Sequence, residues 1–262
     1  MDITTRNFFR LLRAGAFGQQ DMVEPMSASK WRKTMMLSVA HGVEAEAFEG
    51  QEVLRNQFFM QAIPEALRVE WADLAFDTGR KREAKEPQLS PRLAKRLASI
   101  AEKGNALSME YRLLEEMTRL AYALLTDDYW VRQLLILGEL IREKGPQADR
   151  VQLQGWLKRM KMTRMARLEG ALLIELMGVQ PEEVPVSVNP SEFNIEKIAT
   201  AVPHGQDQLR FSQGKNIFVH TSNTSAIVWN ARRSARFFRY CPTSSITQLF
   251  SSFARSLTNI EE

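Results

Sequence analysis

Helical periodicity is the feature of this sequence that most constrains its fold. Apolar residues recur three or four positions apart through most of the 262 residues, which places them on one face of an α-helix. The clearest stripe consists of Trp130, Leu134, Leu137 and Ile141. We therefore predict an all-α, mainly helical protein: a multi-helix bundle with two packed helical blocks.

Glycines are expected to end four of the helices, because glycine readily adopts the left-handed conformation that follows many helices. These are Gly18, Gly42, Gly145 and Gly178. Pro146 follows Gly145 and cannot continue a regular helix. Gly170 falls inside an expected helix, where it lowers helix propensity. We interpret it as a point of close approach by a neighbouring helix.

Helix starts are predicted from hydroxyl side chains that can accept a hydrogen bond from the first turn. Thr4 or Thr5 is expected to cap the first helix. Ser90 and Pro91 form an N-cap and first-turn pair for a later helix.

The predicted division of the chain rests on one change in composition. Residues 78–91 are highly charged, contain two prolines and have little apolar content, which is typical of a linker. We expect an N-terminal helical block over residues 1–77 and a C-terminal helical bundle over residues 92–262.

The overall composition favours a cytoplasmic protein. The single cysteine, Cys241, excludes an intramolecular disulfide and suits a reducing compartment. The N-terminus lacks the apolar core of a secretory signal, and no apolar run approaches the ~20 residues that span a bilayer. With 35 basic and 31 acidic residues, the net charge is too small to identify a dedicated nucleic-acid binder.

No motif predicts a catalytic centre, a metal site or a cofactor. His41, His204 and His220 have no second His or Cys at ligand spacing, so the sequence predicts no zinc site. We expect them to be lone surface or half-buried side chains. Cys241 has no nearby His to activate it, so we expect an inert thiol.

The strongest candidate binding residues are four arginines in the sequence WNARRSARFFRY. Arg232, Arg236 and Arg239 share one helical face, and Arg233 lies beside them. A cationic helix with aromatic neighbours can bind phosphates and stack on bases. Alternatively, the aromatics are core and the arginines cover them with their aliphatic stems.

A second basic group spans an expected helix junction and is open to the same two interpretations. It consists of Lys158, Arg159, Lys161, Arg164 and Arg167.

Three stretches resemble one protein family. FFRLLRAGAFG is similar to the opening helix of a large bacterial family of uncharacterised nucleotidyltransferase-like proteins. WVRQLLILGELIREKG, continuing through LQGWLKRMKMTRMARLEGALLIELMGVQPEEVP, resembles the helices that follow the catalytic core of that family. RFFRYCPTSSITQLFSSFARSL resembles its closing helices. The resemblance covers roughly residues 5–75 and 128–258.

The resemblance implies an active site between these two blocks, from which this sequence departs. The family pattern is a Lys-Gly pair after a strand, then two carboxylates on alternate strand residues that hold magnesium. Here Lys103 and Gly104 echo the first element, but a helix is expected before them. Asp127 and Asp128 are adjacent, so on a strand they would point to opposite faces.

We therefore expect a non-catalytic, degenerate relative of these enzymes that acts as a partner-binding or regulatory module, with a protein as the possible partner. One alternative is a residual magnesium-dependent nucleotidyltransferase using Lys103, Asp127 and Asp128. Another is a nucleic-acid binder using the four C-terminal arginines. A protein partner would be held in an apolar groove between helices.

Overall fold

The computed structural model describes residues 1–76, 89, 91–103, 106–126, 129–199 and 237–240. Every regular element in these ranges is a helix, which confirms the prediction of an all-α multi-helix bundle. The α-helices are α1 (Ile3–Phe17), α2 (Ala28–Ala40), α3 (Glu44–Val53), α4 (Glu65–Phe76), α5 (Pro91–Lys103), α6 (Met109–Thr126), α7 (Trp130–Lys144), α8 (Arg150–Met160), α9 (Thr163–Met177) and α10 (Ile195–Ala199). Three short 3-10 helices accompany them: η1 (Phe58–Met60), η2 (Gly145–Gln147) and η3 (Pro190–Glu192).

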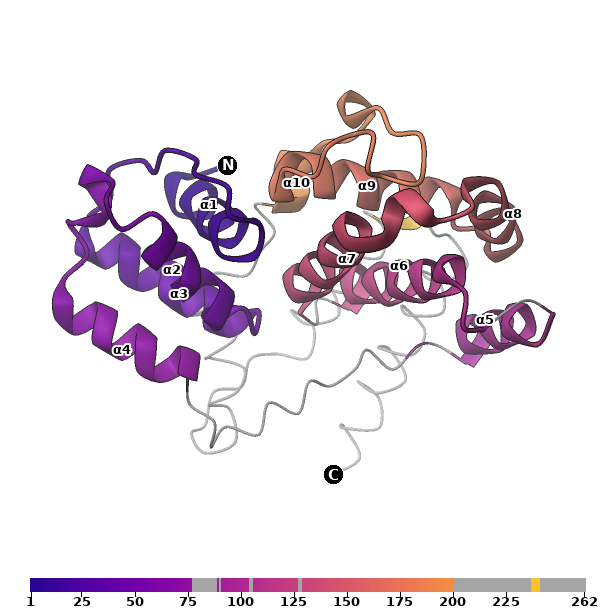
Figure 1. The fold of residues 1–262 in the computed structure, drawn as a ribbon, viewed down its shortest axis with the longest axis horizontal. Coiled ribbons are helices and arrows are strands. Elements are labelled where there is room, and N and C mark those ends of the chain that lie inside the picture. Colours follow the sequence, from indigo (N-terminus) through magenta and orange to yellow (C-terminus); the bar gives the residue numbers. More distant parts are fainter. Residues whose placement is uncertain (77–88, 90, 104–105, 127–128, 200–236, 241–262) are drawn as a thin grey trace, which may run out of the picture.

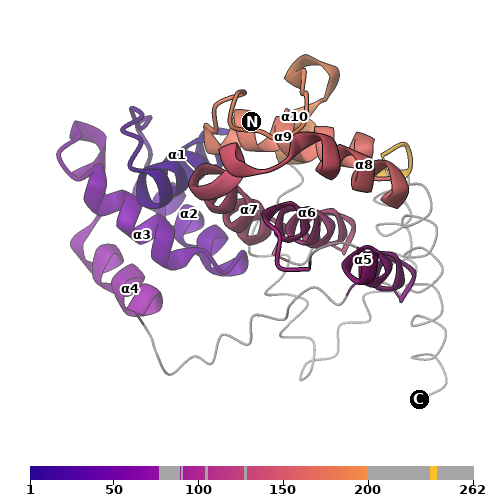
Figure 2. The ribbon, with the colours of Figure 1, turned by 45° about the vertical axis from the view of Figure 1, so that its right-hand side comes forward.

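The helices form two neighbouring groups (Figures 1 and 2). Helices α1 to α4 pack together, and α5 to α10 form the second group. Helix α1 joins the groups, because it contacts α7 and α9 as well as α2 and α3. Residues 78–88 and 90 of the expected linker lie outside the described residues, so the domain division stays a prediction. None of the helices described combines the length and the apolar character needed to cross a bilayer.

The core of the second group is built on α7 and α9. The predicted stripe on α7 is buried along its full length, from Trp130 to Ile141. Helix α9 is buried on most of its circumference, because α1, α6, α7, α8 and α10 all pack against it. Glu169 lies on this helix and is 0 % exposed, and neither of its carboxylate oxygens has a hydrogen-bond partner among the residues that the structure describes.

Most of the predicted helix ends are confirmed. Gly18 and Gly178 are left-handed and follow α1 and α9 directly, and Gly42 is left-handed two residues beyond α2. Gly145 also stops α7, although by a different route from the one expected. It keeps a right-handed conformation and begins the short helix η2.

Two local expectations are wrong. The N-cap of α1 is Asp2 rather than Thr4 or Thr5, and its Oδ1 accepts a hydrogen bond from the Thr5 amide at 2.9 Å. The close approach at Gly170 comes from a loop rather than a helix. A Cβ on Gly170 would lie 2.6 Å from Val188 Cγ2 and 2.9 Å from Val184 Cγ1.

Pro91 is the first residue of α5, as expected for a first-turn proline. Its expected cap, Ser90, lies outside the described residues.

Candidate anion-binding surface

All the charged residues between Asp149 and Glu169 are basic. The residues between these two carboxylates include six lysines and arginines and no acidic residue. They form α8, the first turns of α9 and the two-residue junction, Lys161 and Met162. Local charge of one sign is what an anion-binding surface requires.

Hydrogen bonds at its N-terminus fix the position of α8. Asp149 caps the helix, because its Oδ1 accepts hydrogen bonds from the amides of Val151 and Gln152 at 2.9 and 3.0 Å. The Asp149 amide in turn donates to Glu110 on α6 at 2.8 Å. This bond lowers the pKa of the Glu110 carboxyl, since it favours the charged form. Helix α8 is thereby tied to α6.

Helix α8 is amphipathic, and its basic residues lie on the solvent-facing side. Leu153, Trp156, Leu157 and Met160 are buried, so the residues between them face solvent. Lys158 and Arg159 are accordingly exposed, in the last turn of the helix. Cations in this position also interact favourably with the helix dipole.

A left-handed lysine makes the turn between α8 and α9. Lys161 has a φ of 58°, and its amide donates to the Lys158 carbonyl at 3.0 Å. The next amide, of Met162, donates to the Leu157 carbonyl at 2.9 Å. This turn keeps the exposed Lys161 and Arg164 close in the chain to the end of α8.

Two arginines from distant parts of the chain meet on one tyrosine. The guanidinium carbon of Arg164 lies 5.6 Å from the centre of the Tyr240 ring, and that of Arg239 lies 4.7 Å from it. Tyr240 itself is buried and packs against Phe193, with ring centres 6.0 Å apart. The turn at residues 237–240 therefore lies near the first turn of α9, which carries Arg164. One arginine from each of the two basic groups of the sequence therefore lies here.

Not every cation in this region is available to a ligand. Arg167 contacts both oxygens of Glu192 at 2.9 Å, and Arg150 donates to the Glu182 carbonyl at 2.5 Å. Lys158, Arg159 and Lys161, by contrast, have no acidic partner among the residues described. The C-terminal stretch supplies few acids, since residues 208–260 contain no Asp or Glu.

Helix α5 extends the positive region. The Arg96 guanidinium donates to the Met160 carbonyl at the end of α8, at 3.4 Å, and Lys95 beside it is exposed. We use the name basic surface for one set of side chains at this place: Lys158, Arg159, Lys161, Arg164 and Arg239, with Lys95 and Arg96 at the edge.

The four arginines expected to bind a ligand are only partly placed. Arg239 belongs to the basic surface, whereas Arg232, Arg233 and Arg236 lie outside the described residues. Arg239 covers the buried Tyr240 ring and is itself exposed. The covering interpretation therefore holds for this residue, and the ligand-binding interpretation stays a prediction.

Of the residues considered for residual catalysis, the structure describes only Lys103. Lys103 is the last residue of α5, and the chain is helical again from Met109, in α6. Gly104, Asp127 and Asp128 lie outside the described residues. Within the described part of the chain, no three His, Cys, Asp or Glu side chains come together in a way that could hold a metal ion.

The expectation for His41 is wrong. His41 is 0 % exposed and lies between aromatic rings, 6.4 Å from Phe8 and 6.0 Å from Trp130. It is a core residue rather than a surface or half-buried one. His204, His220 and Cys241 lie outside the described residues.

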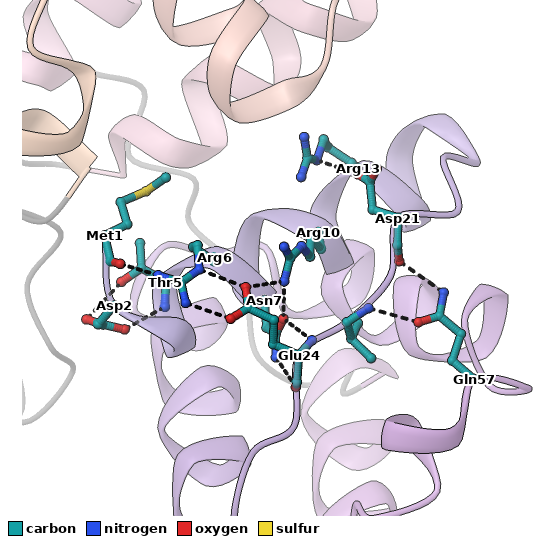
Figure 3. Close-up of polar contacts among 11 residues, drawn as sticks. Met1, Asp2, Thr5, Arg6, Asn7, Arg10, Arg13, Asp21, Glu24 and Gln57 are labelled. Carbon is teal, nitrogen blue, oxygen red and sulfur yellow. Dashed lines mark hydrogen bonds and ion pairs between the residues drawn. The ribbon is translucent and has the colours of Figure 1, made fainter.

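Another group of arginines, on α1, is paired with an acidic side chain (Figure 3). Arg6 and Arg10 each contact a Glu24 oxygen at 2.6 Å. Hydrogen bonding by Arg6 is the main cause that lowers the pKa of Glu24 to about 2. Asn7 adds two hydrogen bonds to the Glu24 backbone, at 2.8 and 3.0 Å. This cluster fixes the α1–α2 loop on α1 and engages both guanidinium groups with the same carboxylate.

Comparison of the chain with family models, with curated proteins and with solved structures finds no significant match.

Proposed function

We propose that this chain is a non-catalytic, nucleotidyltransferase-like protein that acts by binding a partner, and that the basic surface binds a negatively charged macromolecule. A cytoplasmic location and a bacterial source are part of the proposal, on the strength of the single cysteine and the resemblance. The observation that carries the proposal is the group of three exposed cations, Lys158, Arg159 and Lys161, which have no acidic partner in the described structure.

Unpaired cations that lie close together repel one another, and this repulsion is relieved when a polyanion displaces their counterions. Isolated surface charges need no such explanation, but these follow one another along a single turn. The arginines around Glu24 differ in this respect, because both contact the carboxylate that lies between them.

The helical conformation of residues 91–103 and 109–126 supports the non-catalytic part of the proposal. These are the positions where the resemblance would place the strands that carry the active-site lysine and carboxylates. In a nucleotide-transfer assay with magnesium and each of the four ribonucleoside triphosphates, we expect no product. Transfer that is abolished in Asp127→Asn and Asp128→Asn variants would establish an enzyme instead.

Binding is tested with a polyanion that has no bases. Inorganic polyphosphate of long chain length should raise the melting temperature of the protein, because a ligand of the folded state stabilises it. We expect a variant with Lys158→Gln and Lys161→Gln to show a smaller shift. The matched control is Lys30→Gln with Lys33→Gln, since these two lysines are also exposed but lie on α2. Equal shifts in both variants would exclude the basic surface as the binding site.

A further inference from the structure

The basic surface carries an exposed aromatic side chain at its edge. Phe238 is 49 % exposed, whereas its neighbours Phe237 and Tyr240 are 3 % and 4 % exposed. The buried pair holds the turn on the protein, with the Tyr240 amide donating to the Phe237 carbonyl at 2.9 Å. Phe238 is therefore a solvent-facing ring on a fixed backbone, next to Arg239.

The cations of the basic surface suit a chain of phosphates. Lys158, Arg159 and Lys161 lie within one helical turn and its junction, so successive charges of a flexible polyanion can reach them together. Arg164 and Arg239 present planar guanidinium groups, which bind phosphate oxygens through paired hydrogen bonds.

The combination of an exposed aromatic ring with phosphate-binding cations favours one class of polyanion. Single-stranded nucleic acid exposes base faces that stack on aromatic side chains, while its backbone follows the cations. A duplex keeps its bases stacked inside, and polyphosphate has none. An acidic protein does not need the ring, and a membrane surface would call for a larger apolar patch.

We infer that the basic surface binds single-stranded nucleic acid, with phosphates held by Lys158, Arg159, Lys161, Arg164 and Arg239, and with one base stacked on Phe238. This inference rests on the proposed function and names the partner class for the same surface.

The test is fluorescence anisotropy of the full chain with labelled oligouridylate and oligothymidylate of about 16 nucleotides, a length at the upper end of known single-strand sites. We expect Phe238→Ala to weaken binding about tenfold and Phe238→Trp to retain it, since stacking needs an aromatic face. Phe238→Ala should leave polyphosphate binding unchanged. The double variant Lys158→Gln with Lys161→Gln should bind both the oligonucleotides and polyphosphate more weakly. The slope of its log affinity against log salt concentration should be shallower by about 0.7 for each phosphate that is no longer neutralised.

The possible results separate this inference from the proposed function. One result is that polyphosphate binds, the lysine variant binds it more weakly, and Phe238→Ala binds oligouridylate as tightly as the original protein. The surface then binds polyanions without contacting bases, and the inference is overturned. Equal affinity for a duplex of the same length, or preference for poly-glutamate or for vesicles of anionic lipid, also overturns it. If no polyanion binds at all, the proposed function fails with it.

Discussion

Gly15 on α1 and Gly50 on α3 face each other across the crossing of the two helices. A Cβ built on Gly15 would lie 1.9 Å from the Glu46 carbonyl oxygen, and one on Gly50 would lie 2.0 Å from the Leu11 carbonyl oxygen. Both obstacles are backbone atoms, so the helices themselves would have to move apart. The α1–α3 contact, which anchors the N-terminal helices, therefore depends on the absence of two methyl groups.

We predict that Gly15→Ala and Gly50→Ala each destabilise the protein by about 1–3 kcal/mol or more, the usual cost of overpacking. Urea unfolding measures the change. Gly155→Ala is the control, because Gly155 is exposed on α8 and no described atom lies within 4 Å of an added Cβ. There alanine should stabilise by about 0.5–1 kcal/mol. Changes of the same sign at all three positions would contradict the close crossing.

Glu169 should make stability fall as the pH rises. Burial raises its pKa well above the ordinary value of 4.5, so above that pH the unfolded chain releases a proton that the folded chain keeps. The free energy of unfolding therefore falls by about 1.4 kcal/mol per pH unit, until the pH passes the folded-state pKa of Glu169. Glu169→Gln has no proton to release, so its stability advantage over the original protein should grow with pH above 4.5.

Urea unfolding of both proteins between about pH 5 and pH 8 tests this prediction. Glu175→Gln serves as the control, because Glu175 is exposed on the same helix. If the difference between Glu169→Gln and the original protein stays constant with pH, the carboxyl is not held protonated in the fold.

Glu24 should make stability rise with pH, which is opposite to the effect of Glu169, and should do so in a more acidic range. Its folded-state pKa of about 2 lies below the ordinary 4.5, so its contribution is fully present above 4.5 and disappears as the pH falls towards 2. Glu24→Gln should therefore reduce stability at neutral pH and make little difference at the acid end. Thermal unfolding across this range checks the prediction, with the exposed Glu49→Gln as a control that should be neutral throughout.

Arg142 is expected to couple the two groups of helices. Its guanidinium donates to the Gly178 carbonyl at 3.0 Å and lies 4.3 Å from the centre of the Phe17 ring. We predict that Arg142→Ala costs about 1–3 kcal/mol, since it removes both a hydrogen bond from a charged group and a cation–π interaction. Arg142→Lys should recover only part, because an ammonium group is not planar.

The control for this residue is Arg32→Ala, which removes an exposed ion pair with Glu70. Such pairs contribute about 0–1 kcal/mol. Thermal unfolding should place Arg142→Ala as the most destabilised of the three variants. An Arg142→Ala effect no larger than that of Arg32→Ala would show that this arginine does not hold the two groups together.

Much of the helical architecture can be predicted from the sequence, because it is encoded locally. The stripe from Trp130 to Ile141 identifies a buried face by period alone, and Gly18 and Gly178 mark helix ends by their own backbone preferences. The crossing at Gly15 and Gly50 cannot be predicted in this way. Periodicity shows which face of a helix is buried, but not which distant backbone it meets.

The same limit applies to the basic surface. In the sequence, Lys161 and the basic residues around it form one group, and Arg239 belongs to another. Each group is consistent with basic side chains that only cover apolar residues of the core. The interactions of Arg164 and Arg239 with Tyr240 bring them together, and an interaction over that sequence distance leaves no periodic pattern. One local signal does exist: no acidic residue occurs between Asp149 and Glu169.

Lys161 occupies a backbone conformation that glycine adopts without strain and that costs other residues about 1–2 kcal/mol. The φ of 58° favours glycine at this position, whereas the proposed binding favours a positive charge. Lys161→Gly would relax the turn and at the same time remove a cation from the basic surface. If the surface binds as proposed, stability and affinity are in competition at this one position. A search for more stable variants of the protein would then tend to select weaker binders.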